Sequence, residues 1–236
     1  MIGDGGGTAG GYRHFHDELA TLTQRLLEMS ERAESLIDLA VESIVERDRE
    51  KARTVIDGDA LLDRQEVETE NLAISLLALQ QPMARDLRFL IGTIKVCSDI
   101  ERVGDHAVNI AQCTLRLTES RAPIPAMPAL SDMARRARAM LSDAIDAFIR
   151  GDGVLGRSIG QRDDEVDAMH EGIFRSLLTH MMGDPRLISP SLELLLVSRN
   201  LERVADLATN IGENAVYLAE GKQIRHQYDV TTADTP

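Results

Sequence analysis

Aromatic residues are almost absent from this chain. Among its 236 residues there is no tryptophan, and Phe and Tyr together make up only 3%. Proline is also sparse, with seven residues, so few segments are barred from continuing a helix. Alanine, leucine, glutamate, arginine and methionine dominate instead, and this composition favours helix and disfavours a β-sandwich. We therefore expect an all-α protein.

Cysteines and long apolar runs are also scarce, which excludes an intrachain disulfide and a membrane-spanning helix. The two cysteines, Cys97 and Cys113, fall on one expected helix, roughly 24 Å apart at 1.5 Å per residue, so they cannot bond to each other within the chain. No apolar run approaches the ~18 residues of a membrane span, and the glycine-rich start has no apolar signal-peptide core. These features predict a cytoplasmic protein that does not insert into membranes.

Basic residues are too few for a nucleic-acid-binding protein. Lys and Arg number 26 against 39 Asp and Glu, which gives a formal net charge of -13. A chain with this balance is repelled by phosphate backbones and by anionic lipid. The same acidity is compatible with the binding of cations.

Apolar residues recur at spacings of three and four along most of the chain. This pattern predicts six helices, over residues 14–46, 49–79, 83–117, 129–150, 154–182 and 191–219. A proline-rich stretch within 118–128 separates the third helix from the fourth and indicates a linker. The expected organisation is a flexible leader (1–11), a first three-helix repeat (12–120), a second three-helix repeat (125–222) and a polar tail (223–236).

The third and sixth helices carry the same polar sequence. Ser98–Ala111 reads SDIERVGDHAVNIA, and Arg199–Gly212 reads RNLERVADLATNIG. The second and fifth helices also match, at an offset of 104, where Asp59 and Asp63 correspond to Asp163 and Asp167. An internal repeat of about a hundred residues with short connections predicts two pseudo-symmetric, up-down-up three-helix bundles.

Helical phase separates the repeated segment into two faces. At 100° per residue the apolar members form one stripe, which we assign to the bundle core. Glu101 and Asp105 lie on another side, at i and i+4, and Glu202 and Asp206 repeat them. Like charges at this spacing are mildly unfavourable, and a bound cation would reverse the sign of the interaction.

Carboxylate pairs at this spacing are candidate metal ligands. If the second and third helices of each half are antiparallel, their acidic rows face one another. Asp and Glu are oxygen ligands suited to Mg, Mn or Fe, and they also bind Zn. The eight candidate ligands are Asp59, Asp63, Glu101, Asp105, Asp163, Asp167, Glu202 and Asp206. With 39 acids, such a pair arises by chance roughly six times, so a solvated face with Arg102 and Arg203 as local ion-pair partners is the alternative.

Motifs of common enzymes are missing. The sequence contains no GxxxxGK[ST], no GxGxxG and no HExxH, and no Ser/His/Asp set stands out. Gly104 has Ala205 as its counterpart, which indicates close helix packing rather than a phosphate-binding loop. We therefore expect a protein that is not an enzyme.

The duplicated segment resembles the signature of the PhoU family of phosphate-transport regulators. The resemblance extends over most of the chain and includes Phe15-His-Asp-Glu-Leu, Gln81-Pro-Met-Ala-Arg-Asp-Leu-Arg88 and Tyr217-Leu-Ala-Glu-Gly221. It implies two three-helix bundles and, in some members, iron or zinc clusters on acid-x-x-x-acid motifs. The second half departs from the pattern at Ala205, Leu207 and Gly212.

The resemblance also implies a function and partners. It implies a cytoplasmic regulator, peripheral at the inner face of the membrane, which restrains the phosphate-starvation response. The implied partners are the ATPase side of the phosphate ABC transporter and its sensor histidine kinase, and we expect a metal-binding homodimer. Two alternatives stay open at this point: a helical scaffold without metal, and a di-metal carboxylate oxidase. The oxidase requires Glu-x-x-His pairs in a bundle core, whereas the repeated motif reads Glu-x-x-Gly and Glu-x-x-Ala.

Overall fold

The structure is a computed structural model that describes residues 7–119, 123, 125, 128–222 and 224. Over this part of the chain it contains six α-helices and one short 3-10 helix, which confirms the all-α expectation. Their bounds are α1 Gly7–Glu46, α2 Arg49–Gln80, α3 Ala84–Glu119, α4 Pro128–Arg150, α5 Gly153–Gly183, η1 Pro185–Leu187 and α6 Ile188–Glu220. Among the described residues, no helix is both long enough and apolar enough to span a bilayer.

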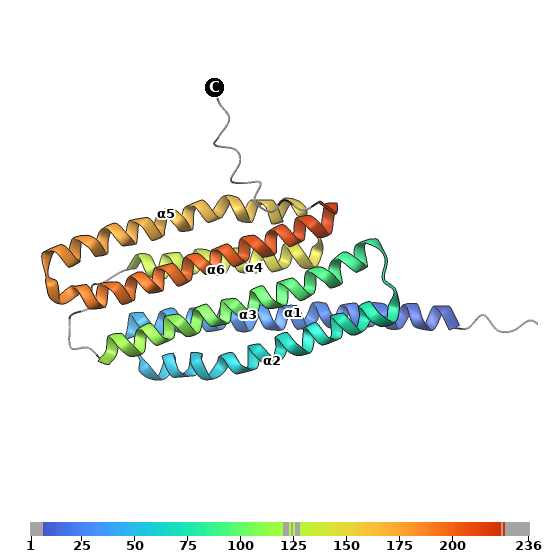
Figure 1. The fold of residues 1–236 in the computed structure, drawn as a ribbon, viewed down its shortest axis with the longest axis horizontal. Helices are drawn as coiled ribbons and strands as arrows, with labels where there is room; N and C mark the ends of the chain where they lie inside the picture. Colours follow the sequence, from blue (N-terminus) through green and yellow to red (C-terminus); the bar gives the residue numbers. More distant parts are fainter. Residues whose placement is uncertain (1–6, 120–122, 124, 126–127, 223, 225–236) are drawn as a thin grey trace, which may run out of the picture.

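The helices are arranged in two layers (Figure 1). Helices α2, α3, α6 and α5 lie side by side in the nearer layer, while α1 and α4 cover the back. Helices α1, α2 and α3 form one up-down-up bundle, and α4, α5 and α6 repeat it. The two bundles meet where α3 packs against α6 and α1 packs against α4.

The apolar stripe of the duplicated motif lies at the centre of the molecule. Its members on α3 and α6 are completely buried: Ile100, Val103, Ala107, Ile110, Leu201, Val204, Ala208 and Ile211. They belong to one hydrophobic core to which all six helices contribute. The halves therefore share a core and do not fold around two separate ones.

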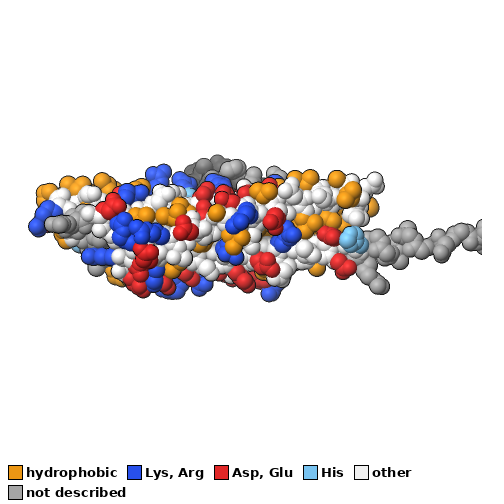
Figure 2. Space-filling model, turned by 90° about the horizontal axis from the view of Figure 1, so that it is seen from below, with side chains coloured by type: hydrophobic (Ala, Val, Ile, Leu, Met, Phe, Trp, Pro, Cys, Tyr) orange, Lys and Arg blue, Asp and Glu red, His pale blue; other side chains and the backbone are white. Residues whose placement is uncertain are grey.

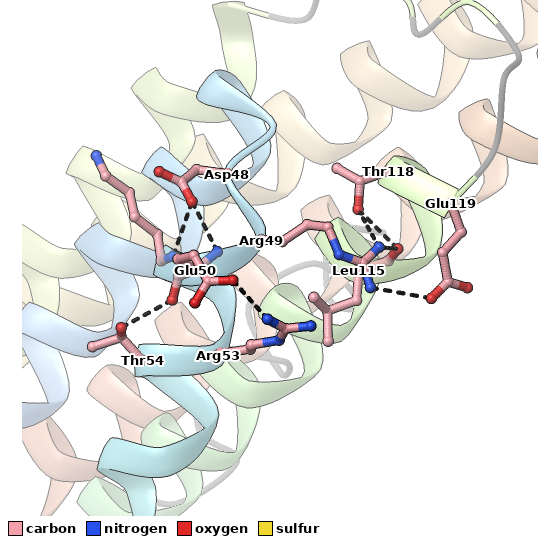
Figure 3. A network of polar contacts seen from close by, with 9 residues as sticks. Asp48, Arg49, Glu50, Arg53, Thr54, Leu115, Thr118 and Glu119 are labelled. Atoms are coloured by element: carbon pink, nitrogen blue, oxygen red, sulfur yellow. Dashed lines mark hydrogen bonds and ion pairs between the residues drawn. The ribbon is translucent and has the colours of Figure 1, made fainter.

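The first turn of each bundle is capped in the same way. Asp48 accepts hydrogen bonds from two backbone amides at the start of α2, and Asp152 does so at the start of α5. Such caps satisfy amides that have no partner within the helix. Next to Asp48, Arg49 donates to the carbonyl oxygen of Leu115 at 3.1 Å and to Thr118 Oγ1 at 3.0 Å (Figure 3). This contact fixes the end of α3 beside the start of α2.

Two helix starts differ from the sequence-based expectation. Helix α1 begins at Gly7, so part of the expected leader (1–11) is helical, and residues 1–6 lie outside the described part. Extending an existing helix costs much less than starting one. Helix α6 begins at Ile188 and not near residue 191, because Pro190 lies in its first turn. The backbone amides of a first turn have no partner within the helix, so a proline, which has no N–H, is tolerated there. Apart from Ile224, the expected tail (223–236) lies outside the described residues.

The two bundles differ most in the helix that covers their back. Helix α1 has 40 residues and α4 only 23. The extra part of α1 buries Phe15 and Leu22 against Leu76 and Leu90 at the α2–α3 end. Helix α4 has no such extension, and the α5–α6 end projects beyond it (Figure 1). At the position on α5 equivalent to Leu76 stands His180, which is exposed.

Helices α5 and α6 approach each other closely at a pair of glycines, Gly156 and Gly212. A Cβ atom on Gly156 would lie 2.6 Å from the carbonyl oxygen of Gly212, and one on Gly212 would lie 2.7 Å from that of Gly156. The first bundle has Ala52 and Ala111 at the equivalent positions. The α5–α6 crossing therefore depends on the missing side chains.

We predict that Gly156→Ala and Gly212→Ala each lower the free energy of unfolding by about 2 kcal/mol, because a Cβ forced against backbone separates the helices. In a chain of this size that corresponds to a drop in melting temperature of roughly 4–8 °C. Gly172→Ala, on the same helix as Gly156, is the control. A Cβ there meets no atom within 4 Å, so it should leave stability unchanged or raise it by up to about 1 kcal/mol. Thermal unfolding followed by circular dichroism measures all three, and equal melting temperatures would contradict the prediction.

Candidate functional site

The structure brings the eight predicted ligands into two groups of four. The first acidic group comprises Asp59 and Asp63 on α2 and Glu101 and Asp105 on α3. The second acidic group comprises Asp163 and Asp167 on α5 and Glu202 and Asp206 on α6. Each group lies between two antiparallel helices, away from the core stripe, as the helical phase predicted.

Gly104 allows α2 to come close to α3 at the first acidic group. A Cβ atom at this position would lie 2.6 Å from Asp59 Oδ1 and 2.6 Å from Leu62 Cδ2. This confirms the expectation that Gly104 serves helix packing. It also explains why the Asp59 carboxylate is partly withdrawn from water, since it lies against the backbone of the neighbouring helix.

Burial and crowding change the acidity of the first acidic group. Burial raises the pKa of Asp59 to about 6, and the charges of Asp63 and Asp105 add to the effect. Burial likewise raises the pKa of Glu101 to about 7, and the charge of Asp105 makes the next largest contribution. Within the described residues, Asp59 Oδ1 is buried and accepts no hydrogen bond. A buried carboxylate oxygen without a donor is unfavourable until a proton or cation reaches it.

Two further acids extend this group along α2. Burial raises the pKa of Glu66, the neighbouring charge of Glu70 raises it further, and a hydrogen bond with Ser98 partly offsets both. The thiol of Cys97 is fully buried nearby, and its pKa is raised by burial and then by Glu70 and Glu66. Cys97 is therefore a protonated thiol at neutral pH.

The second acidic group repeats these properties. Burial raises the pKa of Asp163 to about 7, followed in size by the effects of Asp206 and Asp167. Burial and then the charge of Glu202 raise the pKa of Asp167. Among the described residues, Asp163 Oδ1 has no hydrogen-bond partner, like its repeat counterpart Asp59 Oδ1. The repeat thus preserves both the carboxylates and their unsatisfied state.

A cavity of about 460 Å³ opens beside the second acidic group, and one of its walls comes from the other bundle. Arg102 and His106 of α3 line it together with Arg203 of α6. Arg203 forms an ion pair with Asp206 at 2.8 Å, and His106 Nδ1 lies 2.9 Å from Asn200 Oδ1. The sequence analysis placed Arg102 beside the acidic row of its own helix and assigned no function to His106. The packing of α3 against α6, which brings both residues to this cavity, leaves no signal in the sequence of either repeat.

His170 introduces a nitrogen donor that the first group lacks. Its Nδ1 lies 2.9 Å from Ser198 Oγ, whose own proton is donated to the carbonyl oxygen of Leu195 at 3.0 Å. With the serine proton donated there, Nδ1 is the donor in this contact, and this tautomer of the imidazole has its lone pair on Nε2. The repeat counterpart of His170 is Glu66, so the two sites differ in chemistry.

The chemistry of the donors fits a divalent cation, but their positions do not form a finished site. Carboxylate oxygens without hydrogen-bond donors are the ligands that hard cations prefer. Within the described part of the chain, however, no three His, Cys, Asp or Glu side chains are placed together so as to hold a metal ion. A cation would therefore have to draw the carboxylates of each group inward by side-chain rotation.

Acidic and basic side chains are mixed on the surface outside the two acidic groups where it can be seen in Figure 2. Figure 2 shows them interspersed on the face seen from below. Exposed pairs such as Arg53–Glu50 and Arg175–Glu171 contribute little to stability individually. The two acidic groups differ from this background in being partly buried and crowded.

Comparison with known proteins identifies the family. A model of the PhoU domain matches twice, over residues 26–114 and 130–215. PhoU homologues named as phosphate-specific transport system accessory proteins are 39% identical in Rhizobium meliloti, over 89% of this chain and 88% of theirs, and 40% identical in Caulobacter vibrioides, over 91% and 94%.

Solved structures agree with the sequence matches. The crystal structure of PhoU from Pseudomonas aeruginosa superposes with a TM-score of 0.83 at 33% identity, over 88% of this chain and all of that one. The phosphate transport system regulatory protein PhoU from Streptococcus pneumoniae gives 0.81 at 31% identity, over 89% and 98%. Both the repeated family match and the shared two-bundle fold lead to one conclusion: this chain belongs to the PhoU family.

Proposed function

We propose that this protein is a regulatory accessory protein of phosphate uptake that restrains the phosphate-starvation response when phosphate is plentiful. It acts in the cytoplasm, at the inner face of the membrane, by contacting the ATPase side of the phosphate ABC transporter and the sensor histidine kinase, and not by catalysis. The observation that carries this proposal is the match of nearly the whole chain to accessory proteins of phosphate-specific transport systems. Dimer formation is part of the same proposal.

Metal binding at the two acidic groups is the second part of the proposal. In each group two carboxylates have raised pKa values, and one buried carboxylate oxygen lacks a hydrogen-bond donor. Concentrating like charges in this way lowers stability unless a cation compensates. The first group offers oxygen ligands suited to Mg or Mn, while His170 beside the second group adds a ligand suited to Zn or Fe.

A regulator that binds no metal is the competing candidate. The observation that favours it is the lack, in the described residues, of three ligands already placed to hold an ion. In that case protonation, and not a cation, neutralises the carboxylates. Elemental analysis of protein purified without chelator or affinity metal distinguishes the two candidates.

The regulatory role makes a genetic prediction. Deletion of the gene in its source organism should leave a phosphate-starvation reporter active at high phosphate, and the wild-type gene on a plasmid should restore repression. The reason is that the proposed protein transmits phosphate sufficiency from transporter to kinase. Reporter activity at high and low phosphate measures the effect. Full repression in the deletion strain at high phosphate would contradict the proposal.

Metal binding should stabilise the folded chain. Mn²⁺ at about a hundred times its dissociation constant should raise the free energy of unfolding by about 2.7 kcal/mol, or the melting temperature by roughly 5–10 °C. The variant Asp59→Asn/Glu101→Gln/Asp163→Asn/Glu202→Gln should lose this response, while the exposed control Asp57→Asn keeps it. Without metal the fourfold variant should melt higher than wild type, since like charges are removed, so its lost response cannot be ascribed to misfolding. An unchanged response in that variant would place the metal elsewhere.

The raised pKa values predict a pH dependence of stability. Protons bind Glu101 and Asp163 more tightly in the folded chain, where the pKa values are about 7, than in the unfolded chain, where they are about 4. The contribution of these groups to stability is therefore full below pH about 4 and is lost as the pH rises to about 7. Urea unfolding of metal-free protein across this window should show a shallower decline for Glu101→Gln/Asp163→Asn than for wild type. Parallel curves would contradict the prediction.

A further inference from the structure

The free end of the second bundle consists of two helices without a third. It is formed by the last turns of α5, the 3-10 helix η1 and the first turns of α6, and it projects beyond the start of α4 (Figure 1). We call this segment, residues 174–196, the α5–α6 tip. On the side that α1 would cover in the first bundle, α5 presents Ser176 and His180, where α2 has Leu72 and Leu76. Both residues are exposed, so this side of the tip is adapted to water.

The opposite side of the tip is apolar and exposed. Six large side chains there are each at least 43% exposed: Phe174, Leu178 and Met182 on α5, and Ile188, Leu192 and Leu196 on α6. On both helices they recur every four residues, which places them in a stripe along each helix. Figure 2 likewise shows hydrophobic side chains gathered toward the ends of the molecule.

This exposure is not a by-product of the short α4. The side of the tip left open by α4 carries Ser176 and His180 on α5, whereas the side that none of the described helices covers carries the six exposed apolar residues. A contiguous exposed apolar patch on a protein is typically an interaction site. The two stripes flank the groove between the packed helices α5 and α6, and each extends over eight residue steps, or about 12 Å.

The same groove is acidic farther from the tip. Asp167 precedes Phe174 by seven residues, or two helical turns, and so continues the α5 stripe. Glu202 follows Leu196 by six residues, about 120° farther around α6, so it lies beside the α6 stripe and not in line with it. The charge of Glu202 contributes to the raised pKa of Asp167, so the two carboxylates lie near each other. Of the bases on these helices, Arg175 is paired with Glu171 and Arg203 with Asp206, while Arg199 stands exposed on α6. The five acids at 163, 164, 167, 202 and 206 outnumber the bases beside them, which are Arg102 of α3 and Arg199 and Arg203 of α6.

We infer that the α5–α6 tip docks an amphipathic helix of a partner protein, with apolar side chains over the two stripes and Lys or Arg at one end over Asp167 and Glu202. An apolar face that continues into an acidic one is complementary to such a helix, which is a common mode of peptide recognition. The inference rests on the proposed function in one respect, namely that the protein works through contacts with other proteins. It goes further by naming the surface and the chemistry of the partner.

A designed peptide tests the surface directly. The probe is a fluorescein-labelled helical peptide of about 18 residues with Leu at three- and four-residue spacing and Lys in its last third, and its match has Glu in place of every Lys. Binding to the full chain is measured by fluorescence anisotropy. We expect the Lys peptide to bind about tenfold more tightly than the Glu peptide, and Leu178→Ser/Leu192→Ser to weaken it about tenfold. Val45→Ser/Val154→Ser replaces two exposed apolar residues elsewhere and should leave binding unchanged.

Several outcomes would overturn the inference. These are equal binding of the two peptides, undiminished binding by the Leu178→Ser/Leu192→Ser variant, or no binding to the wild type. A wild-type dimer that this variant dissociates, seen by sedimentation, would assign the tip to a second copy and overturn it as well. Circular dichroism checks that the variant folds. The reporter assay separates the two proposals. If the wild-type protein binds no peptide but still represses the reporter at high phosphate, the docking surface is refuted and the proposed function stands.

Discussion

The packing of α3 against α6 is the contact on which the rest of the molecule depends. The two helices carry the same sequence motif and bury its apolar stripe completely, with Val103 and Val204 among the central members. Because one core joins all six helices, the bundles are held in one fixed relation. A helix has only one face to give to a core. Once that face is committed, Glu101 and Glu202 must lie at the grooves toward α2 and α5.

Carboxylates at a helix–helix groove have an electrostatic cost, and the packing of the helices does not require them. Neutral side chains of similar shape would fit the same positions without raised pKa values or an unsatisfied Asp59 Oδ1. Both bundles nevertheless keep the carboxylates and the unsatisfied oxygen. Elsewhere the repeats have diverged, as at Gly104 and Ala205 or at Glu66 and His170. Divergence around a retained, destabilising group indicates that the group serves a function other than stability.

Local periodicity carried most of the fold prediction, and tertiary contacts account for what it missed. Spacing of apolar residues located all six helices, and phase located both acidic groups, because each depends only on neighbours along one helix. The start of α6 was misplaced, since Pro190 reads as a stop although a first turn tolerates it. The wall that Arg102 and His106 supply to the second cavity was not foreseen either. It arises from a contact between residues about a hundred positions apart, which no window of the sequence contains.

The two proposed occupants of the second bundle are not independent. A divalent cation among Asp163, Asp167 and Glu202 would neutralise the charge that attracts the basic end of a docked helix, while leaving the apolar stripes of the tip unchanged. Each occupant would then weaken the other by the same factor, because coupling between two binding equilibria is reciprocal. The first bundle has its own acidic group, but α1 covers the back of its α2–α3 end, where the large exposed apolar residues are Ile74, Leu79, Met83 and Leu87 against six at the α5–α6 tip. The proposed cation site and the proposed docking surface therefore lie side by side in the second bundle.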